Sequence, residues 1–147
     1  MKPKIVTVVP CYRAEKTVMG IIEDIKKTRY EGDSPYIVTV IDGELDNTFD
    51  QLWNLQKTEG VPEVILKYKE NRGKTGAMRS SLKYLIGEDP EVDVLEAKEA
   101  KNPEIFTYID SDGQQRFDEL FNNIGLSLLE GDYDFGHIER RQPIKCP

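Results

Sequence analysis

Apolar runs and helix-spaced apolar residues alternate along the 147 residues of this chain. Continuous apolar runs, typical of strands buried on both faces, cover residues 4–9, 36–41, 64–68 and 105–109. Each run is followed by apolar residues at helical spacing: Val18, Ile21, Ile22 and Ile25, then Phe49, Leu52 and Trp53, then Met78, Leu82 and Leu85, and last Phe117, Leu120, Phe121, Ile124 and Leu128. A short strand is expected near residues 133–138. This alternation predicts an α/β fold with a mostly parallel sheet flanked by helices on both faces.

The composition predicts one globular domain over residues 1–147. Hydrophobic residues make up 38% of the chain and charged residues 32%, as in an ordinary soluble protein with a real core. Residues 87–104 are rich in Glu and Asp and poor in apolar residues, so we expect an acidic, solvated and mobile insertion there. The two cysteines, Cys11 and Cys146, do not form a metal-type or redox-type pair, which favours a cytoplasmic protein with reduced thiols.

The charge and the hydropathy pattern exclude several classes of function. A net charge of −7 argues against nucleic acid as a partner, because a phosphate backbone demands a basic surface. No apolar stretch approaches the length that spans a bilayer. Residues 1–4 lead directly into a strand-like run, so no signal peptide is expected. His137 is the only histidine, which argues against a Ser-His-Asp hydrolase and a multi-histidine zinc site.

The apolar run at 105–109 stops at two carboxylates, Asp110 and Asp112, with Gln114 close behind. In an extended chain residues two apart point the same way, so both carboxylates would aim at one point. A hard cation such as Mg²⁺ or Mn²⁺ would relieve their repulsion. The alternative is a loop whose aspartates cap the helix that begins near Phe117. This segment alone leaves both interpretations open.

Polar residues collect where four of the predicted strands end, in residues 10–13, 42–44, 71–74 and 110–112. In a parallel sheet these four loops lie at the same edge, where open α/β folds bind their ligands. The third loop is not a nucleotide-triphosphate P-loop, because Tyr68 stands where that motif needs glycine. It is either a diphosphate cradle at a helix start, with Arg72, Lys74 and Arg79 nearby, or a solvated charged turn.

Four segments in this order resemble the nucleotide-binding half of an inverting family 2 glycosyltransferase of GT-A type. The motifs most resemble those of the dolichyl-phosphate mannose or glucose synthases. Residues 5–17 (IVTVVPCYRAEKT) are similar to the family's first strand with its Pro-x-Tyr-Asn-Glu-Glu signature, and residues 38–48 (VTVIDGELDNT) to Val-Asp-Asp-Gly-Ser-x-Asp-x-Thr. Residues 71–85 (NRGKTGAMRSSLKYL) resemble the Asn-x-Gly-Lys-Gly-x-Ala helix entry. Residues 110–114 match Asp-Ala-Asp-Gly-Gln almost residue for residue.

The resemblance implies a compact GT-A fold and a set of roles for the matching residues. Asp110, Asp112 and Gln114 would bind Mg²⁺ or Mn²⁺, and the two aspartates would be the catalytic carboxylates through that metal. The nucleotide would be bound by Pro10, Tyr12, Asp42, Gly73, Lys74, Asp110 and Arg140.

The chain also departs from the family pattern. Arg13 and Ala14 replace Asn-Glu, and Ile41 replaces the first Asp of Asp-Asp-Gly. Glu44 replaces Ser, and residues 138–139 replace the Gly-Ser that precedes Arg140. The sequence stops at Pro147, whereas the family continues with an acceptor-facing half.

The function implied is metal-dependent, inverting transfer of a sugar from a GDP- or UDP-sugar to an acceptor. A polyprenyl phosphate suits a short chain, because this anion attacks without a general base; it would place the protein at the membrane surface. The alternative is a non-catalytic or partner-dependent nucleotide-sugar-binding module, completed by a homo-oligomer or a second subunit. A response-regulator-like domain would explain Asp42 and Asp110 but not the spacing of residues 110–114.

Overall fold

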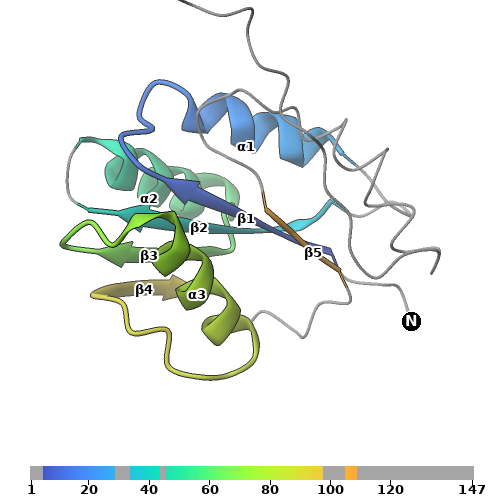
Figure 1. The fold of residues 1–147 in the computed structure, drawn as a ribbon. Helices are drawn as coiled ribbons and strands as arrows, with labels where there is room; N and C mark the ends of the chain where they lie inside the picture. Colours follow the sequence, from blue (N-terminus) through green and yellow to red (C-terminus); the bar gives the residue numbers. More distant parts are fainter. Residues whose placement is uncertain (1–4, 29–33, 44–45, 98–104, 109–147) are drawn as a thin grey trace, which may run out of the picture.

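Four of the five described strands run parallel and form most of the sheet (Figure 1). The computed structural model describes residues 5–28, 34–43, 46–97 and 105–108. The strands are β1 (Ile5–Cys11), β2 (Tyr36–Asp42), β3 (Val64–Tyr68), β4 (Val94–Ala97) and β5 (Ile105–Tyr108). Their order is β4-β3-β2-β1-β5, and β4 alone among them runs antiparallel to its neighbour.

Helices cover both faces of this sheet, as the alternating pattern predicts. α1 (Val18–Lys27) and α2 (Thr48–Glu59) lie on one face, where Ile22 and Leu52 pack with the odd-numbered strand residue Val9. α3 (Gly73–Leu85) lies on the opposite face, where Leu85 packs with the even-numbered Val8. Because β1, β2 and β3 are buried on both faces, they read as continuous apolar runs. The mostly parallel α/β fold is confirmed.

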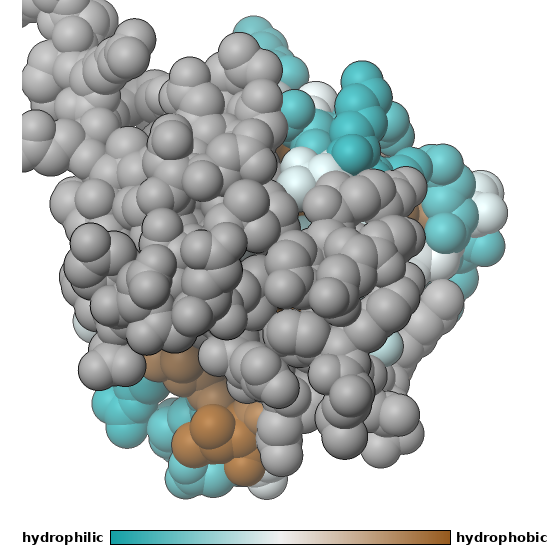
Figure 2. All heavy atoms as spheres, turned by 90° about the vertical axis from the view of Figure 1, so that its right-hand side faces the viewer, coloured by the Kyte–Doolittle hydropathy of each residue, from teal (hydrophilic) through white to brown (hydrophobic). Residues whose placement is uncertain are grey.

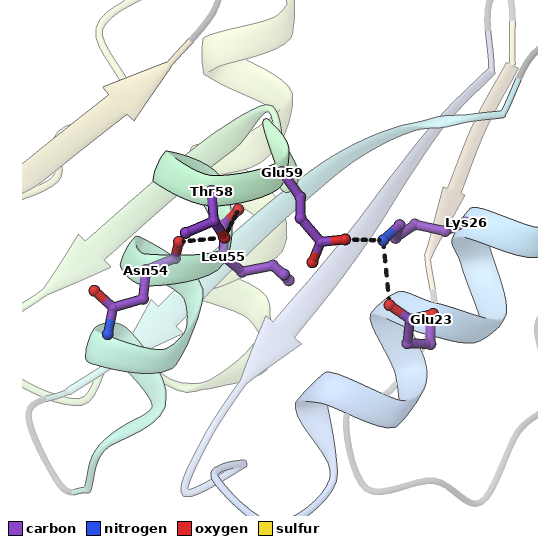
Figure 3. A network of polar contacts seen from close by, with 6 residues as sticks. All are labelled: Glu23, Lys26, Asn54, Leu55, Thr58 and Glu59. Carbon is purple, nitrogen blue, oxygen red and sulfur yellow. Dashed lines mark hydrogen bonds and ion pairs between the residues drawn. The ribbon is translucent and has the colours of Figure 1, made fainter.

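The helix ends of α1 and α2 meet in a polar contact at the surface. Lys26 Nζ lies 3.0 Å from Glu59 Oε1 of α2 and 3.2 Å from Glu23 Oε1 of its own helix (Figure 3). In the same view Thr58 Oγ1 donates to the carbonyl of Asn54 at 2.9 Å. Since these side chains are exposed to solvent, they align the helix ends but add little to the stability of the core.

The inward face of α3 corrects one prediction from the sequence. Met78 and Leu82, expected in the core, are 38% and 42% exposed, whereas the small residues Ala77, Ser80 and Ser81 are buried. Small side chains on the inward face allow the helix to approach the sheet closely. The larger Met78 and Leu82 lie on the other side of the helix, toward solvent. Figure 2 shows apolar surface on one side of the described part of the molecule.

Several element boundaries also differ from those predicted. β1 continues past Pro10, paired with Val40, although the proline was expected to end it. β4 lies within the acidic stretch 87–104, where no strand was predicted. The helix predicted at 117–128 and the strand predicted at 133–138 lie outside the described residues.

Two buried threonines, Thr7 and Thr107, join β1 to β5. The hydroxyl oxygens of Thr7 and Thr107 lie 2.8 Å apart, and the Thr107 hydroxyl donates to the carbonyl of Val6 at 3.2 Å. The proton of Thr107 is thus committed to the backbone, and Thr7 donates to Thr107. Thr107 therefore satisfies two groups, and Thr7 only one.

We predict that Thr107→Val destabilises the fold more than Thr7→Val, although both remove one hydroxyl. Thr107→Val leaves the Thr7 hydroxyl buried without its partner, which costs about 1–3 kcal/mol, whereas Thr7→Val costs about 0.5–1.5 kcal/mol. The double variant should be no worse than Thr107→Val alone, because it leaves neither hydroxyl unsatisfied. Urea unfolding curves of the three variants measure these differences, and equal losses in both single variants would contradict the assignment of the donor.

Candidate functional site

The carboxyl ends of the parallel strands bring three polar loops to one edge of the sheet. Cys11 pairs with Ile41, and Asp42 pairs with Tyr68, so β1, β2 and β3 end at nearly the same level. Tyr12, Asp42 and residues 69–73 therefore lie together along this edge, as the sequence predicted. β5 runs in the same direction and leads the chain toward the same edge, two residues before Asp110. Asp110, Asp112, Gln114 and Arg140 lie outside the described residues.

Asp42 joins the end of β2 to the start of α3. Its side chain is only 5% exposed. One carboxylate oxygen accepts the backbone N–H of Arg72 at 2.5 Å, and the other accepts the N–H of Gly73 at 2.8 Å. The Asn71 side-chain oxygen also accepts the Gly73 N–H, at 2.8 Å. Asp42 thus occupies two N–H groups at the start of α3, those of Arg72 and Gly73.

Tyr68 supports the same turn from beneath. Its buried hydroxyl donates to the carbonyl of Gly76 at 2.8 Å and contacts the Ser80 hydroxyl. The Arg72 guanidinium lies 4.2 Å from the ring centroid of Tyr68 and also donates to the carbonyl of Glu91 at 2.7 Å. Arg72, which the sequence placed near a possible diphosphate cradle, is therefore engaged in contacts with the protein itself.

Conformation at Gly73 and lack of space at Gly76 explain why these two positions are glycine. Gly73 has a φ of +81°, a conformation that side-chain-bearing residues rarely adopt. A Cβ at Gly76 would lie 2.9 Å from the Cβ of Arg72. The motif glycine at 73 therefore shapes this turn, and its role in binding a nucleotide stays a prediction. Lys74 follows it in the first turn of α3.

The loop after β1 presents the exposed side of the edge. Tyr12 is 51% exposed, and the guanidinium of Arg13 lies 5.6 Å from its ring centroid. Arg13 has a φ of +49°, which turns the chain sharply after the strand. Pro10 is buried within β1 just before this turn. Tyr12 therefore offers an aromatic surface at the edge, where a planar ring could stack.

A second set of contacts joins the loop after β1 to the start of α2. Asp46 accepts the Glu15 N–H at 3.2 Å, and it accepts both the N–H and the hydroxyl of Thr48 at 3.0 and 2.6 Å. Glu15 returns the contact, since its carboxylate accepts the Asn47 N–H at 3.3 Å and its carbonyl accepts the Gln51 amide at 3.0 Å. Glu15, Asp46 and Thr48 match motif positions, but no role was predicted for them from the sequence. Their common role is to join two loops.

The surroundings of Asp46 favour its charged form. Burial by itself raises the pKa of this carboxyl, but the hydrogen bonds from Thr48 and Glu15 and the positive charge of Arg13 outweigh it. The pKa of Asp46 therefore lies below its ordinary value. A carboxylate held charged in this way stabilises the fold near neutral pH.

Two side chains at the strand ends, those of Ile41 and Cys11, are buried in the core. Ile41 is 4% exposed and packs on the face covered by α1 and α2, where the family has an aspartate. Cys11 is 1% exposed in the same cluster. Burial raises the pKa of the Cys11 thiol well above its ordinary value, and the negative charge of Asp46 is a second, smaller cause. Neither side chain is accessible to a ligand.

The described part of the chain contains neither a metal-type cluster nor a membrane-spanning helix. Within it, no group of three or more His, Cys, Asp and Glu side chains is placed to hold a metal ion. The described helices include none that is long and apolar enough to cross a bilayer. The predicted metal ligands Asp110, Asp112 and Gln114 lie outside this part, so the predicted Mg²⁺ or Mn²⁺ site stays a prediction.

The fold is similar to that of a glycosyltransferase of known structure. Staphylococcus aureus TarS, a glycosyltransferase, superposes on 85% of this chain with a TM-score of 0.55, at 18% sequence identity. The match covers 20% of the TarS chain. At this identity the likeness shows a shared fold, in agreement with the glycosyltransferase-type α/β architecture expected from the motifs.

Sequence comparison adds two curated relatives, both named uncharacterized proteins of Methanocaldococcus jannaschii. MJ1222 is 29% identical over 133 residues, which is 90% of this chain and 45% of the relative. MJ0544 is 24% identical over 81 residues, 55% of this chain and 33% of the relative. The chain thus spans less than half the length of these relatives. No family model matches it.

The buried thiol of Cys11 should be unreactive in the folded protein. In a Cys146→Ser background, Ellman's reagent at pH 8 should not modify Cys11 during a period that fully modifies the urea-unfolded chain, because both burial and the raised pKa suppress the thiolate. Rapid labelling of the folded protein would show that the end of β1 opens to solvent.

Asp46→Asn should lower the free energy of unfolding by about 1 kcal/mol at pH 7, the usual cost of losing a helix-start carboxylate. Because the folded-state pKa of Asp46 is lowered, its contribution is present above the ordinary value of 3.8 and is lost as the pH falls through the folded pKa. The difference from wild type should therefore shrink below about pH 4. Asp50→Asn, at an exposed carboxylate in the first turn of α2, is the matched control and should cost less. Identical pH profiles for the two variants would contradict this account.

Proposed function

We propose that this chain forms the nucleotide-sugar-binding domain of a metal-dependent, inverting glycosyltransferase. The observation that supports it best is the gathering of the motif-bearing ends of β1, β2 and β3 at one sheet edge, in a fold shared with a glycosyltransferase. Each motif alone is weak, whereas their order along the chain and their common edge agree with a single ligand site.

The proposed donor is a nucleotide-diphosphate sugar, with GDP and UDP as the candidate nucleotides. Tyr12 offers an exposed ring against which a base would stack. Pro10 and Gly73 shape the same edge through their backbone, and Asp42 shapes it through its carboxylate. Lys74 and Arg140 would supply positive charge toward the diphosphate.

The proposed metal ligands are Asp110, Asp112 and Gln114, whose oxygen atoms suit Mg²⁺ or Mn²⁺. A bound divalent ion would neutralise the charge that develops on the diphosphate leaving group. Asp110 and Asp112 would hold that ion beside the strand ends, because β5 delivers the chain to this edge two residues before Asp110.

For the acceptor we propose a lipid phosphate such as a polyprenyl phosphate. Its oxygen is already an anion, so attack on the sugar needs no general base. The chain covers under half of the length of its curated relatives. The second candidate is a nucleotide-sugar-binding module that acts only with a second copy or another subunit, and the buried Ile41 at a motif aspartate position favours it.

Calorimetric titration tests the proposed donor site. UDP, GDP and their sugar conjugates are titrated with and without Mn²⁺ or Mg²⁺ into wild-type protein, Asp112→Asn and Asp24→Asn. We expect metal-dependent binding of one nucleotide, weakened by about tenfold or more in Asp112→Asn through loss of a charged metal ligand. Asp24→Asn makes the same chemical change near the C-terminal end of α1 and should bind like wild type.

Two other outcomes would separate the candidates. Metal-dependent binding without sugar transfer to a polyprenyl phosphate would favour the partner-dependent module over the enzyme. If no nucleotide binds with either metal, both candidates fail for this chain.

A further inference from the structure

Both oxygens of the buried Asp42 carboxylate are engaged within the protein. Each of its oxygens accepts one backbone N–H, from Arg72 at 2.5 Å and from Gly73 at 2.8 Å, and the side chain is 5% exposed. Direct recognition of a nucleoside requires an accessible acceptor, which this geometry does not offer. Asp42 nevertheless lies at the sheet edge that carries the proposed nucleotide site, so its effect there must pass through the groups it holds.

Those groups form the turn of residues 71–73, which we call the helix-entry turn. Besides Asp42, the Asn71 side chain accepts the Gly73 N–H at 2.8 Å, and Gly73 supplies the positive φ. Arg72 lies over the Tyr68 ring, and the Tyr68 hydroxyl donates to the Gly76 carbonyl. The turn is thus fixed from β2, from β3 and from within α3.

Asp42 also changes the electrostatics at the start of α3. Free N–H groups at a helix start attract anions, including phosphate groups. Here a carboxylate already occupies the N–H groups of Arg72 and Gly73. Those two N–H groups are therefore closed to a diphosphate, and a full positive charge for the diphosphate at this end of α3 must come from a side chain. The next residue, Lys74, is the cationic candidate.

We propose that Asp42 is a positioning residue for the nucleotide site: it fixes the helix-entry turn and so places Lys74 for the diphosphate, without touching the ligand itself. This inference rests on the proposed function. It differs from a direct contact in a measurable way, because the effect of Asp42 must depend on Lys74.

The test compares Asp42→Asn, Lys74→Gln and the double variant by calorimetric titration with the nucleoside diphosphate that binds wild-type protein, in the presence of metal. The amide of Asn places a donor against a backbone N–H, so Asp42→Asn should loosen the turn and weaken binding about tenfold. This loss is expected even though the variant removes a negative charge near a bound anion. Lys74→Gln should weaken binding in the wild-type background but have a clearly smaller effect when residue 42 is already Asn.

Two further variants control for a simple loss of stability. Glu63→Gln weakens a comparable contact at the opposite edge of the sheet, where the carboxylate accepts the Ile37 N–H at 2.7 Å, and it should leave nucleotide affinity unchanged. Asn71→Ala removes only the second acceptor of the Gly73 N–H and should weaken nucleotide binding by a smaller factor than Asp42→Asn. If Asp42→Asn does not fold, Asn71→Ala with and without Lys74→Gln provides the same comparison.

The outcomes distinguish this inference from the proposed function. No nucleotide binding by wild-type protein would overturn the proposed function itself. Wild-type binding with additive effects of Asp42→Asn and Lys74→Gln would overturn positioning and indicate a direct contact. Tighter binding by Asp42→Asn would also overturn it, because the carboxylate would then merely compete with phosphate for the helix N–H groups.

Discussion

The common direction of β1, β2, β3 and β5 is the constraint on which the candidate site depends. Parallel strands must be joined by crossovers, and α1 and α2 return the chain to the start of the sheet before β2 and β3. The antiparallel β4 precedes β5 along the chain. The four parallel strands consequently point to the same edge, and the loops after β1, β2 and β3 are brought together although about thirty residues separate them in the sequence. Asp42 reaches Arg72 and Gly73 only because β2 and β3 end side by side.

The close approach of α3 to the sheet follows from its small inward residues and from Tyr68. The α3 residues Ala77, Ser80 and Ser81 are buried on the side of the helix that faces the sheet. The Ser80 hydroxyl contacts the Tyr68 hydroxyl. Tyr68 fills the space that these small side chains leave, while its hydroxyl binds the Gly76 carbonyl. The same packing that completes this face of the core therefore also fixes the first turns of α3, so the site edge and the core are parts of one arrangement.

Sequence patterns predicted those features that depend on local burial. The run at 64–68 coincides with β3 because the strand is buried on both faces: Ile65 belongs to one core cluster, and Val64, Leu66 and Tyr68 belong to the other. The outward position of Met78 and Leu82 was missed, because periodicity cannot tell which of two neighbouring faces a helix turns to the sheet when the inner face is built from small residues. β4 was missed because an edge strand needs few apolar residues. The partners of Asp42 lie thirty residues away, beyond the reach of any local pattern.

The different surroundings of Ile41 and Asp42 explain why the first aspartate of the Asp-Asp-Gly motif can be replaced while the second is kept. A pair of adjacent strand-end carboxylates points to opposite faces of the sheet, so the two positions do different work. Here the even-numbered Asp42 faces α3 and holds the helix entry, while Ile41 faces α1 and α2 and joins the core with Cys11. The structural carboxylate is retained, and the carboxylate on the other face is absent. Under the proposed function, recognition of the base along this edge would therefore depend on stacking against Tyr12 and on loop groups, which discriminate less sharply between nucleotides than a buried carboxylate does.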